Sequence, residues 1–429
     1  MRKNKHRFAA VVAATAMVAT GAAACGGGGG SGGEVTLTFW THTHPPMVKL
    51  NKKLIAAYEK KHPNVTIEYQ TIPNTQFGTK MLTALSNGTG PDIINMDDGA
   101  LRGEYIPKNL VAPIDPKTFG AKSIADLKSR YLPHAVDGAK GPDGTLYGVP
   151  SELDATAFVI NTKHFADAGL DPNKPPETWN DVVSYGKKLV AAGHKQAFNF
   201  SYIHSGWYMT DYQTLLAQTG GALANPSCSK ATADQPGSVQ AMQTWAELAR
   251  DSGIANPNTA SREATAPFTD LASGKQSMAL AWPWSMEQIK ESNPKTYKQL
   301  KVVPLPQVNP DDPVVRWYGY DWAVNSASEN KTEAWKFIAF LSSHPQQWLS
   351  DVGFFQGRKG WENTEAGKNI DFAGAWSKAY TNGKFDHVCQ HWSEVKDQLK
   401  DAVDKVVFDG ADPKKALDQA NAQMQTSIG

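Results

Sequence analysis

The chain has 429 residues, which is long enough for two or three domains of ordinary size. Its 43 basic and 42 acidic side chains leave a net charge of +1, which argues against nucleic acid or any other strongly charged partner. The 13 Trp and 13 Tyr residues, beside 16 Phe, are enough to supply both a core and an aromatic binding surface.

The N-terminus has the pattern of an export signal followed by a tether. Residues 1–24 combine a basic start, an apolar run over residues 8–20 that is too short to span a bilayer, and a small-residue end. Cys25 follows directly, in a context that resembles a bacterial lipobox, and residues 25–33 are otherwise Gly-rich. We therefore expect a signal peptide, a lipid on Cys25 and a flexible tether, which would anchor the protein outside the cell membrane. The alternative is an ordinary secreted protein in which Cys25 is incidental.

The next part of the chain alternates strand and helix patterns. Residues 34–39 alternate apolar and polar side chains, as a half-buried strand does, and lead into a loop with Trp40, His42 and His44. The pattern then predicts helix, strand, helix and buried strand over residues 50–60, 65–69, 77–86 and 92–96. This order favours a largely parallel sheet covered by helices, with a ligand bound just past the carboxyl ends of the strands. The Asp97-Asp98 pair follows the last of these strands and lies at that edge.

Residues 144–189 predict two strands and two helices in close succession. The strands cover residues 146–150 and 155–161. Asp154 interrupts the apolar run between them. Asn161 is placed to cap a short helix that ends at Gly169, and Thr178 is placed to cap a longer amphipathic helix.

The rest of the chain has aromatic residues where predicted strands end. We expect strands over residues 198–202, 278–281, 302–306 and 317–324. Trp207 follows the first of them, Trp282 and Trp284 follow the second, and the fourth contains Tyr320 and Asp321. The third is expected to return to the sheet of the N-terminal part. Core positions in predicted helices are held by Trp179, Trp245, Trp335 and Trp348.

Several stretches resemble the extracellular solute-binding proteins of ABC importers, and most closely their carbohydrate-binding branch, which includes maltose-binding protein. They are TLTFW, LSNGTGPDII, YGVP followed by AGLD and PPETW, MALAWPW, and YGYDWAVNSASENKTEAWKFIAFLSS. The resemblance implies an α/β fold of two lobes joined by a hinge, each lobe a mostly parallel sheet with flanking helices. It implies that residues 34–148 and 302–355 form lobe 1, and that residues 149–301 and 356–429 form lobe 2. It also implies a monomer that hands its ligand to the permease subunits of an importer.

The expected ligand follows from the same residues. A pyranose has apolar C–H faces and a belt of hydroxyls, so its site combines flat rings with hydrogen-bonding side chains. The residues expected there are Trp40, His42, Asp97, Asp98, Asp154, Trp207, Trp282, Trp284, Tyr320, Asp321 and, from the resemblance, Trp392. Any one of these Trp residues could instead be a core ring, and Asp154 a buried structural acid. Several Trp residues favour a di- or oligosaccharide. Arg316 and Arg358 are the only arginines expected near the site, which favours a neutral ligand.

Once Cys25 is lipidated, Cys228 and Cys389 remain, and two such cysteines in an oxidising compartment are expected to form a disulfide. A competing interpretation is a metal site, because His387 and His391 flank Cys389. Since that motif lacks the usual ligand spacing of a zinc site, we expect the disulfide and no metal.

Three classes of function are compatible with these features. The first is a lipid-anchored receptor that closes around an oligosaccharide. The second is a glycosidase with paired carboxylates, such as Asp97 or Asp98 with Asp154. The third is a binding protein for a non-sugar solute. The sequence has no nucleophile elbow, no H-E-x-x-H motif and no P-loop. We therefore expect a sugar-binding protein that is not an enzyme and needs no cofactor.

Overall fold

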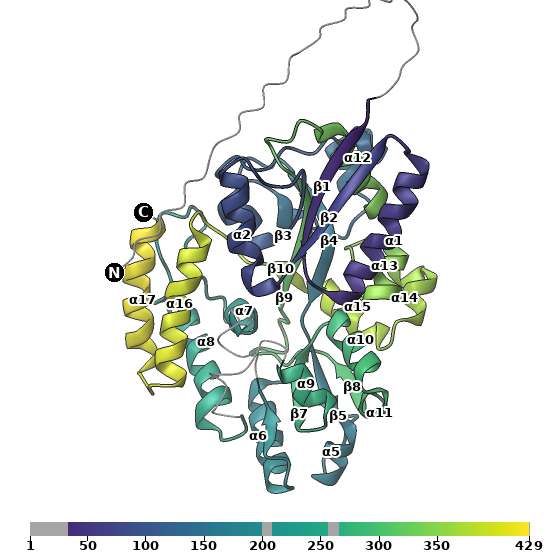
Figure 1. Ribbon diagram of the computed structural model, residues 1–429. Coiled ribbons are helices and arrows are strands. Elements are labelled where there is room, and N and C mark those ends of the chain that lie inside the picture. The colour runs from purple at the N-terminus through teal and green to yellow at the C-terminus, as the bar shows by residue number, and fades with distance from the viewer. Residues whose placement is uncertain (1–32, 200–207, 256–265, 429) are drawn as a thin grey trace, which may run out of the picture.

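A computed structural model describes residues 33–199, 208–255 and 266–428 of the chain, and this part contains two β-sheets with helices around them (Figure 1). The first sheet contains β1 (Val35–His42), β2 (Val65–Ile72), β3 (Ile93–Asp97), β4 (Gly148–Ala155), β9 (Val315–Val324) and β10 (Gly383–Phe385). The second contains β5 (Ala157–Asn161), β6 (Gln196–Phe198), β7 (Gln276–Ala281) and β8 (Leu300–Val303). The predicted class, an α/β fold built on two sheets, is confirmed.

Helices pack around both sheets (Figure 1). In the first half of the chain they are α1 (Pro45–Lys61), α2 (Asn74–Ser86), α3 (Asp98–Ala100), α4 (Ile124–Lys128), α5 (Thr162–Asp167), α6 (Trp179–Ala191) and α7 (Tyr208–Gln218). In the second half they are α8 (Pro236–Ala246), α9 (Ala266–Ala272), α10 (Pro283–Ser292), α11 (Pro294–Tyr297), α12 (Lys331–Ser342), α13 (Pro345–Val352), α14 (Glu365–Asn369), α15 (Ala373–Thr381), α16 (Trp392–Val407) and α17 (Pro413–Ile428). Short π-helical and 3₁₀ segments are η1 (Leu101–Tyr105), η2 (Pro116–Phe119), η3 (Asp137–Ala139), η5 (Glu247–Asp251) and η6 (Trp361–Asn363).

The helix boundaries after β5 follow from local chemistry. The side chain of Asn161 accepts hydrogen bonds from the backbone N–H groups of the first turn of α5. Gly169 ends that segment with a φ of 68°, which glycine adopts without strain. Thr178 and Asp181 form a reciprocal capping box at the start of α6. These predicted caps are confirmed.

Mostly parallel sheets were expected; the first sheet is mixed, with three parallel ladders, one of them between β9 and β10, and two antiparallel ones, and the second sheet is mostly antiparallel. In the first sheet β1 pairs in parallel with β2 and β3, but β9 pairs antiparallel with both β3 and β4. In the second sheet only the β6–β7 pair is parallel among the described pairs, and β5 is antiparallel to β7 and β8. The physical reason is that β5 and β9 enter their sheets from the other sheet. No helical crossover within one sheet therefore fixes their direction.

The chain passes between the two sheets at several points. Thr156 alone separates β4 in the first sheet from β5 in the second. The strand expected to return to the first sheet at residues 302–306 is instead β8, which pairs with β5 in the second sheet, and β9 makes the return. Residues 383–385 were expected in lobe 2, but β10 pairs with β9 in the first sheet. The sheet that each of these strands joins is decided by the strand with which its backbone pairs, and a short apolar run in the sequence does not identify that partner.

The remaining features concern the core, the cysteines and the surface. The four Trp residues predicted for the helical core are all buried: Trp179, Trp245, Trp335 and Trp348.

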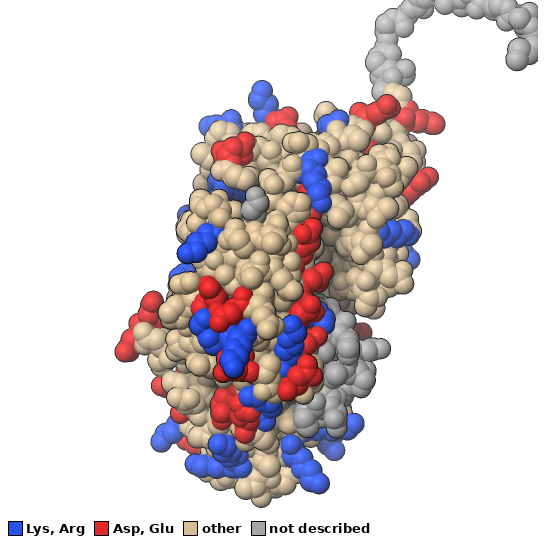
Figure 2. All heavy atoms as spheres, turned by 90° about the vertical axis from the view of Figure 1, so that its left-hand side faces the viewer, with Lys and Arg blue, Asp and Glu red and all other residues tan. Residues whose placement is uncertain are grey.

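Cys228 and Cys389 form a disulfide, with their Cα atoms 5.7 Å apart. Among the described helices, none combines the length and apolar character needed to cross a membrane. Figure 2 shows basic and acidic side chains interspersed on the face that carries α16 and α17, as the near-zero net charge predicts.

Candidate functional site

The centre of the candidate site is the β4–β9 pair, where two acids and two phenols share one face. Glu152 and Asp154 are two residues apart on β4, so their side chains point to the same side of the strand. In the antiparallel register Glu152 lies opposite Tyr320, and Asp154 lies opposite Tyr318. This face therefore alternates carboxyl and hydroxyl groups next to Thr156, the residue that leads into the second sheet.

Asp154 is 0% exposed, and its carboxylate oxygens make no hydrogen bond of good geometry with the described residues, although the side chains of Glu152 and Tyr318 lie close enough to favour its charged form. One oxygen of Glu152 is likewise buried and unpaired there. Buried polar atoms in native proteins are nearly always hydrogen-bonded, because leaving one unpaired costs about 1–3 kcal/mol. The two carboxyls can therefore supply unused hydrogen-bonding capacity to a bound molecule.

Burial also changes the protonation of these two acids. It raises the pKa of Asp154 to about 6. Burial, together with the nearby charge of Asp154, raises the pKa of Glu152 well above its ordinary value. Two carboxyls in one dry environment do not both ionise readily, so near neutral pH the pair retains a proton. Such a pair offers both an O–H donor and carboxylate acceptors, which suits a ligand rich in hydroxyls.

Two Trp rings from the second sheet pack beside these acids. β7 ends at Ala281, and Pro283 then fixes the first turn of α10, with Trp282 as its N-cap residue. The rings of Trp282 and Trp284 are parallel within 5°, with their centroids 6.0 Å apart. The indole N–H of Trp282 donates to Thr156 Oγ1 at 3.2 Å, and that of Trp284 donates to Tyr318 Oη at 2.9 Å. The structure therefore brings Trp282, Trp284 and Asp154 together across the two sheets.

Two imidazoles approach from the end of β1. The ring of His42 lies 4.6 Å from that of Tyr320, and the ring of His44 lies 6.3 Å from that of Trp284. The Nδ1 atoms of both histidines are buried without a hydrogen-bond partner among the described residues. Burial lowers the pKa of His42 to about 3 and that of His44 to about 4. Both rings are therefore neutral at pH 7, and each can donate one hydrogen bond and accept another.

The acids after β3 use more of their hydrogen-bonding capacity within the protein than Glu152 and Asp154 do. Asp97 Oδ1 accepts a hydrogen bond from the backbone N–H of Ala100, and so caps α3. Asp98 accepts from the Arg102 guanidinium at 2.5 Å and from the backbone N–H of Gly319 at 3.2 Å. Asp321 is buried, and burial, reinforced by the charge of Asp98, raises the pKa of its carboxyl well above its ordinary value. Much of the acceptor capacity of Asp97 and Asp98 is thus already used within the protein.

The other expected site residues lie elsewhere. Trp40 lines a surface groove of α2, where Lys80 Nζ is 5.4 Å from its ring centroid. Trp392 begins α16 and packs on α3 and η1, so closely that a Cβ at Gly103 would lie 2.5 Å from the Trp392 Cβ. Trp392 thus docks the C-terminal helices onto α3 and η1. Two further expected residues, Trp207 and the lipidation residue Cys25, lie outside the described residues.

Both arginines expected near the site have partners in the protein. Arg316 pairs with Asp386 at 2.5 Å. Arg358 donates from Nη2 to the backbone carbonyl and hydroxyl of Ser342, both at 2.6 Å, and its guanidinium lies 4.2 Å from the ring centroid of Tyr131. Each guanidinium thus has a partner, although Arg316 Nη1 and Arg358 Nε are buried without one among the described residues.

The sequence analysis did not single out Glu152, Tyr318 or Thr156 for the site. The i, i+2 spacing of Glu152 and Asp154 on a strand was a usable signal for the first. Tyr318 and Thr156 become relevant only through the β4–β9 register and the indole hydrogen bonds.

Most of the chain matches one family of known proteins. Residues 41–348 match the family described as bacterial extracellular solute-binding protein. A putative binding protein of Brucella abortus is 23% identical over 401 residues, which cover 91% of this chain and 92% of that protein. A probable amino-acid ABC transporter periplasmic-binding protein of Sinorhizobium fredii is 27% identical, over 65% of this chain and 62% of that protein.

Solved structures give the same picture for the fold. An ABC transporter solute-binding protein from Thermotoga lettingae, bound with alpha-D-tagatose, is similar with a TM-score of 0.81 and 21% identity, over 92% of this chain and 100% of that one. A maltose-bound protein of T. maritima gives a TM-score of 0.81 at 19% identity, over 91% of this chain and 99% of that one. At these identities the likeness is one of fold.

Proposed function

The chain belongs to the family of bacterial extracellular solute-binding proteins, and from that premise we propose that it binds a sugar, most readily a di- or oligosaccharide, and delivers it to the permease of an ABC importer. The observation that carries the sugar proposal is the pair of parallel Trp rings beside the buried acids Glu152 and Asp154. Aromatic faces cover the C–H faces of a pyranose, and carboxyl groups bond its hydroxyls.

The electrostatics of the cluster support a neutral ligand. Its histidines are uncharged at pH 7, and Arg316 and Arg358 are already paired within the protein. The buried acids Glu152 and Asp154 would repel a second carboxylate or a phosphate. A polyhydroxylated neutral molecule satisfies the unpaired atoms without adding charge to a dry site.

The ligand would bind between two lobes built on the two sheets, which would close on it by a hinge motion. Lobe 1 would contain the parts of the chain that build the first sheet, residues 34–155 and 315–355 together with β10, and lobe 2 would contain β5 to β8 and the C-terminal helices. Thr156 and the segment between β8 and β9 would act as crossings. The hydrogen bond of Trp284 to Tyr318 joins elements of the two sheets, so it would respond to closure.

A lipid on Cys25 would hold the protein at the outer face of the cell membrane, with residues 25–33 as the tether. Expression of Cys25→Ser in the native host tests this part of the proposal. The variant should appear in the culture medium, while the wild type stays with the membrane fraction. Equal release of both proteins would show that Cys25 is not an anchor.

The ligand itself is tested by a thermal-shift screen of the mature protein against sugars, amino acids, peptides and polyols, followed by calorimetric titration of each hit. A ligand that binds only the folded state raises the melting temperature with concentration, by an amount that corresponds to about 2.7 kcal/mol at a hundred times Kd. Trp284→Phe should weaken binding of the hit about tenfold or more, because it removes part of the ring face and the hydrogen bond that fixes the ring on Tyr318 Oη. Trp335→Phe, which changes a buried ring in α12, is the matched control and should bind as the wild type does.

A second candidate is a non-sugar solute, since the Sinorhizobium fredii relative is named as an amino-acid transporter protein. A thermal shift with an amino acid and with none of the sugars would select this candidate. Catalysis is not part of the proposal, because the family to which the chain belongs consists of binding proteins. Prolonged incubation with a bound oligosaccharide should therefore leave it intact, as chromatography would show.

A further inference from the structure

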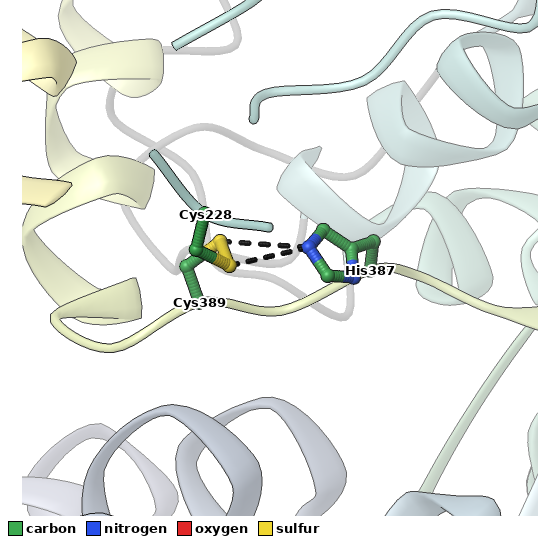
Figure 3. Close-up of side chains that lie close together, drawn as sticks. All are labelled: Cys228, His387 and Cys389. Atoms are coloured by element: carbon green, nitrogen blue, oxygen red, sulfur yellow. Dashed lines mark hydrogen bonds between the residues drawn. A yellow bond between two sulfur atoms is a disulfide. The ribbon is translucent and has the colours of Figure 1, made fainter. Parts of the chain in front are cut away.

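A second cluster of chemically reactive side chains surrounds the disulfide. The Nε2 atom of His387 lies 3.2 Å from Cys228 Sγ and 3.6 Å from Cys389 Sγ, so one imidazole nitrogen faces both sulfurs (Figure 3). These three ligand atoms all lie within 4.8 Å of one another. His391, the other imidazole in the same stretch of sequence, is outside the trio and lies 3.5 Å from Glu394 instead.

The loop that carries Cys228 is held in place by more than the disulfide. Ala224 and Ala231 form a β-bridge at its base, and the backbone N–H of Cys228 donates to the carbonyl of Asn225 at 2.9 Å. The side chain of Asn225 accepts from the N–H groups of Ser229 and Lys230, at 2.9 and 3.1 Å. These bonds do not involve sulfur, so we expect the loop to keep its shape when the disulfide is broken.

The partner segment is held independently as well. Cys389 is 3% exposed, and its carbonyl packs against Gly103, where an added Cβ would be 2.9 Å away. The backbone of Asn225 lies close enough to the imidazole of His387 to oppose the lowering of its pKa by burial. Metal-binding histidines usually have their second ring nitrogen fixed by a backbone carbonyl or a carboxylate, which sets the ring orientation. The three groups are therefore placed to remain together as free side chains.

We propose that reduction of the Cys228–Cys389 disulfide turns this cluster into a binding site for a borderline-soft divalent metal ion such as Zn²⁺. The ligands are the two thiolates and the Nε2 atom of His387. Zinc binds Cys sulfur at about 2.3 Å and His nitrogen at about 2.0–2.1 Å, usually with tetrahedral geometry. Three protein ligands leave one position open. A cavity of about 1090 Å³ is lined by all three residues, so water or a small solute can reach that position.

The chemistry requires two balanced steps. A dithiol reductant outside the cytoplasm gives two electrons and two protons to the disulfide, which yields two Cys thiols, while the reductant becomes a disulfide. The metal ion then binds as both thiols lose their protons, and His387 coordinates as the neutral imidazole. Since one sulfur pair cannot be both a disulfide and two thiolates, metal binding and the oxidised state exclude each other. The site is gated by the redox state.

Cobalt titration of the full-length protein tests the proposal, because Co²⁺ bound to thiolates in a tetrahedral site absorbs in the near ultraviolet and the visible. The protein is reduced with a phosphine and desalted without oxygen, and far-ultraviolet circular dichroism verifies that it stays folded. The reduced wild type should bind one equivalent of Co²⁺ with thiolate charge transfer, Zn²⁺ should displace it, and the oxidised protein should show no such signal. Reduction that unfolds the protein, or a reduced protein without the signal, overturns the proposal.

Three variants locate the ion. His387→Ala should weaken cobalt binding by about tenfold or more. His391→Ala, the matched control two residues beyond Cys389, should bind as the wild type does. The double variant Cys228→Ser/Cys389→Ser still contains Cys25 and should give no thiolate signal. A signal that persists in the double variant, or unchanged affinity in His387→Ala, would place the metal elsewhere and overturn the proposal.

Discussion

Replacement of Asp154 by Asn should stabilise the unliganded protein at neutral pH, although it should impair ligand binding. Asp154 is fully buried, and its carboxylate oxygens make no hydrogen bond of good geometry with the described residues. The charged form is therefore costly to bury, and the pKa of the carboxyl rises from 3.8 to about 6. Asn has nearly the same shape and no charge, so it removes that cost.

The magnitude follows from the two pKa values. Below pH 3.8 the carboxyl is protonated in both the folded and the unfolded state, so no charge is buried. As the pH rises, the unfolded chain releases its proton first, and the stability of the folded state falls until the pH passes about 6. A shift of about 2 units corresponds to about 3 kcal/mol. The stability advantage of Asp154→Asn over the wild type should thus grow by about 3 kcal/mol between pH 3 and pH 7.

The assay compares the melting temperatures of both proteins at a series of pH values without ligand. For a folding unit of 150–250 residues, about 3 kcal/mol corresponds to about 6–12 °C. The buried histidines His42 and His44 change stability in the opposite direction below pH 6.5, because their pKa values are lowered. They are present in both proteins, so their effect cancels in the difference. The neighbouring Tyr318 stays protonated throughout, because burial raises the pKa of its phenol.

The reasoning would be refuted by a difference in melting temperature that does not change with pH, or that grows as the pH is lowered. Glu152→Gln is the matched variant, and its advantage should also grow with pH, since burial raises the pKa of Glu152 too. The sugar that stabilises the wild type should stabilise Asp154→Asn much less. An unchanged ligand response would show that this carboxyl is structural and that the ligand contacts other groups.

Three further variants test the fold. Cys228→Ser with Cys389→Ser should lower the free energy of unfolding by about 4–5 kcal/mol, because the disulfide closes a loop with a sequence separation of 161 residues; urea unfolding measures this, and an unchanged midpoint would contradict it. Gly103→Ala should cost about 1–3 kcal/mol in the same assay, since its Cβ would lie 2.5 Å from the Trp392 Cβ; a neutral result would mean that α16 shifts freely. Thr178→Ala should cost about 1 kcal/mol by removing the N-cap of α6, and the far-ultraviolet circular dichroism should otherwise match the wild type.

Local sequence chemistry was sufficient for much of the fold. Hydrophobic periodicity and the caps at Asn161 and Thr178 predicted helices and strands, because residues close in sequence decide whether these elements form. The local sequence did not predict the direction of the strands or the sheet to which each strand belongs. β8 and β10 are short, and their partners β5 and β9 are far away in sequence, so local pattern contains no information on which sheet they join.

The candidate site divides in the same way. The sequence by itself determined that Trp282, Trp284 and Asp154 lie where strands end, because Pro283 and the polar interruption of an apolar run are local signals. Only the tertiary structure decided that these three meet, that Trp40 faces α2, and that Trp392 packs on Gly103. The physical reason is that a side chain's type follows from the chain, whereas its neighbours and its access to water follow from long-range packing. Burial then decides whether a carboxyl is an ordinary surface charge or, as for Asp154, a group with a raised pKa.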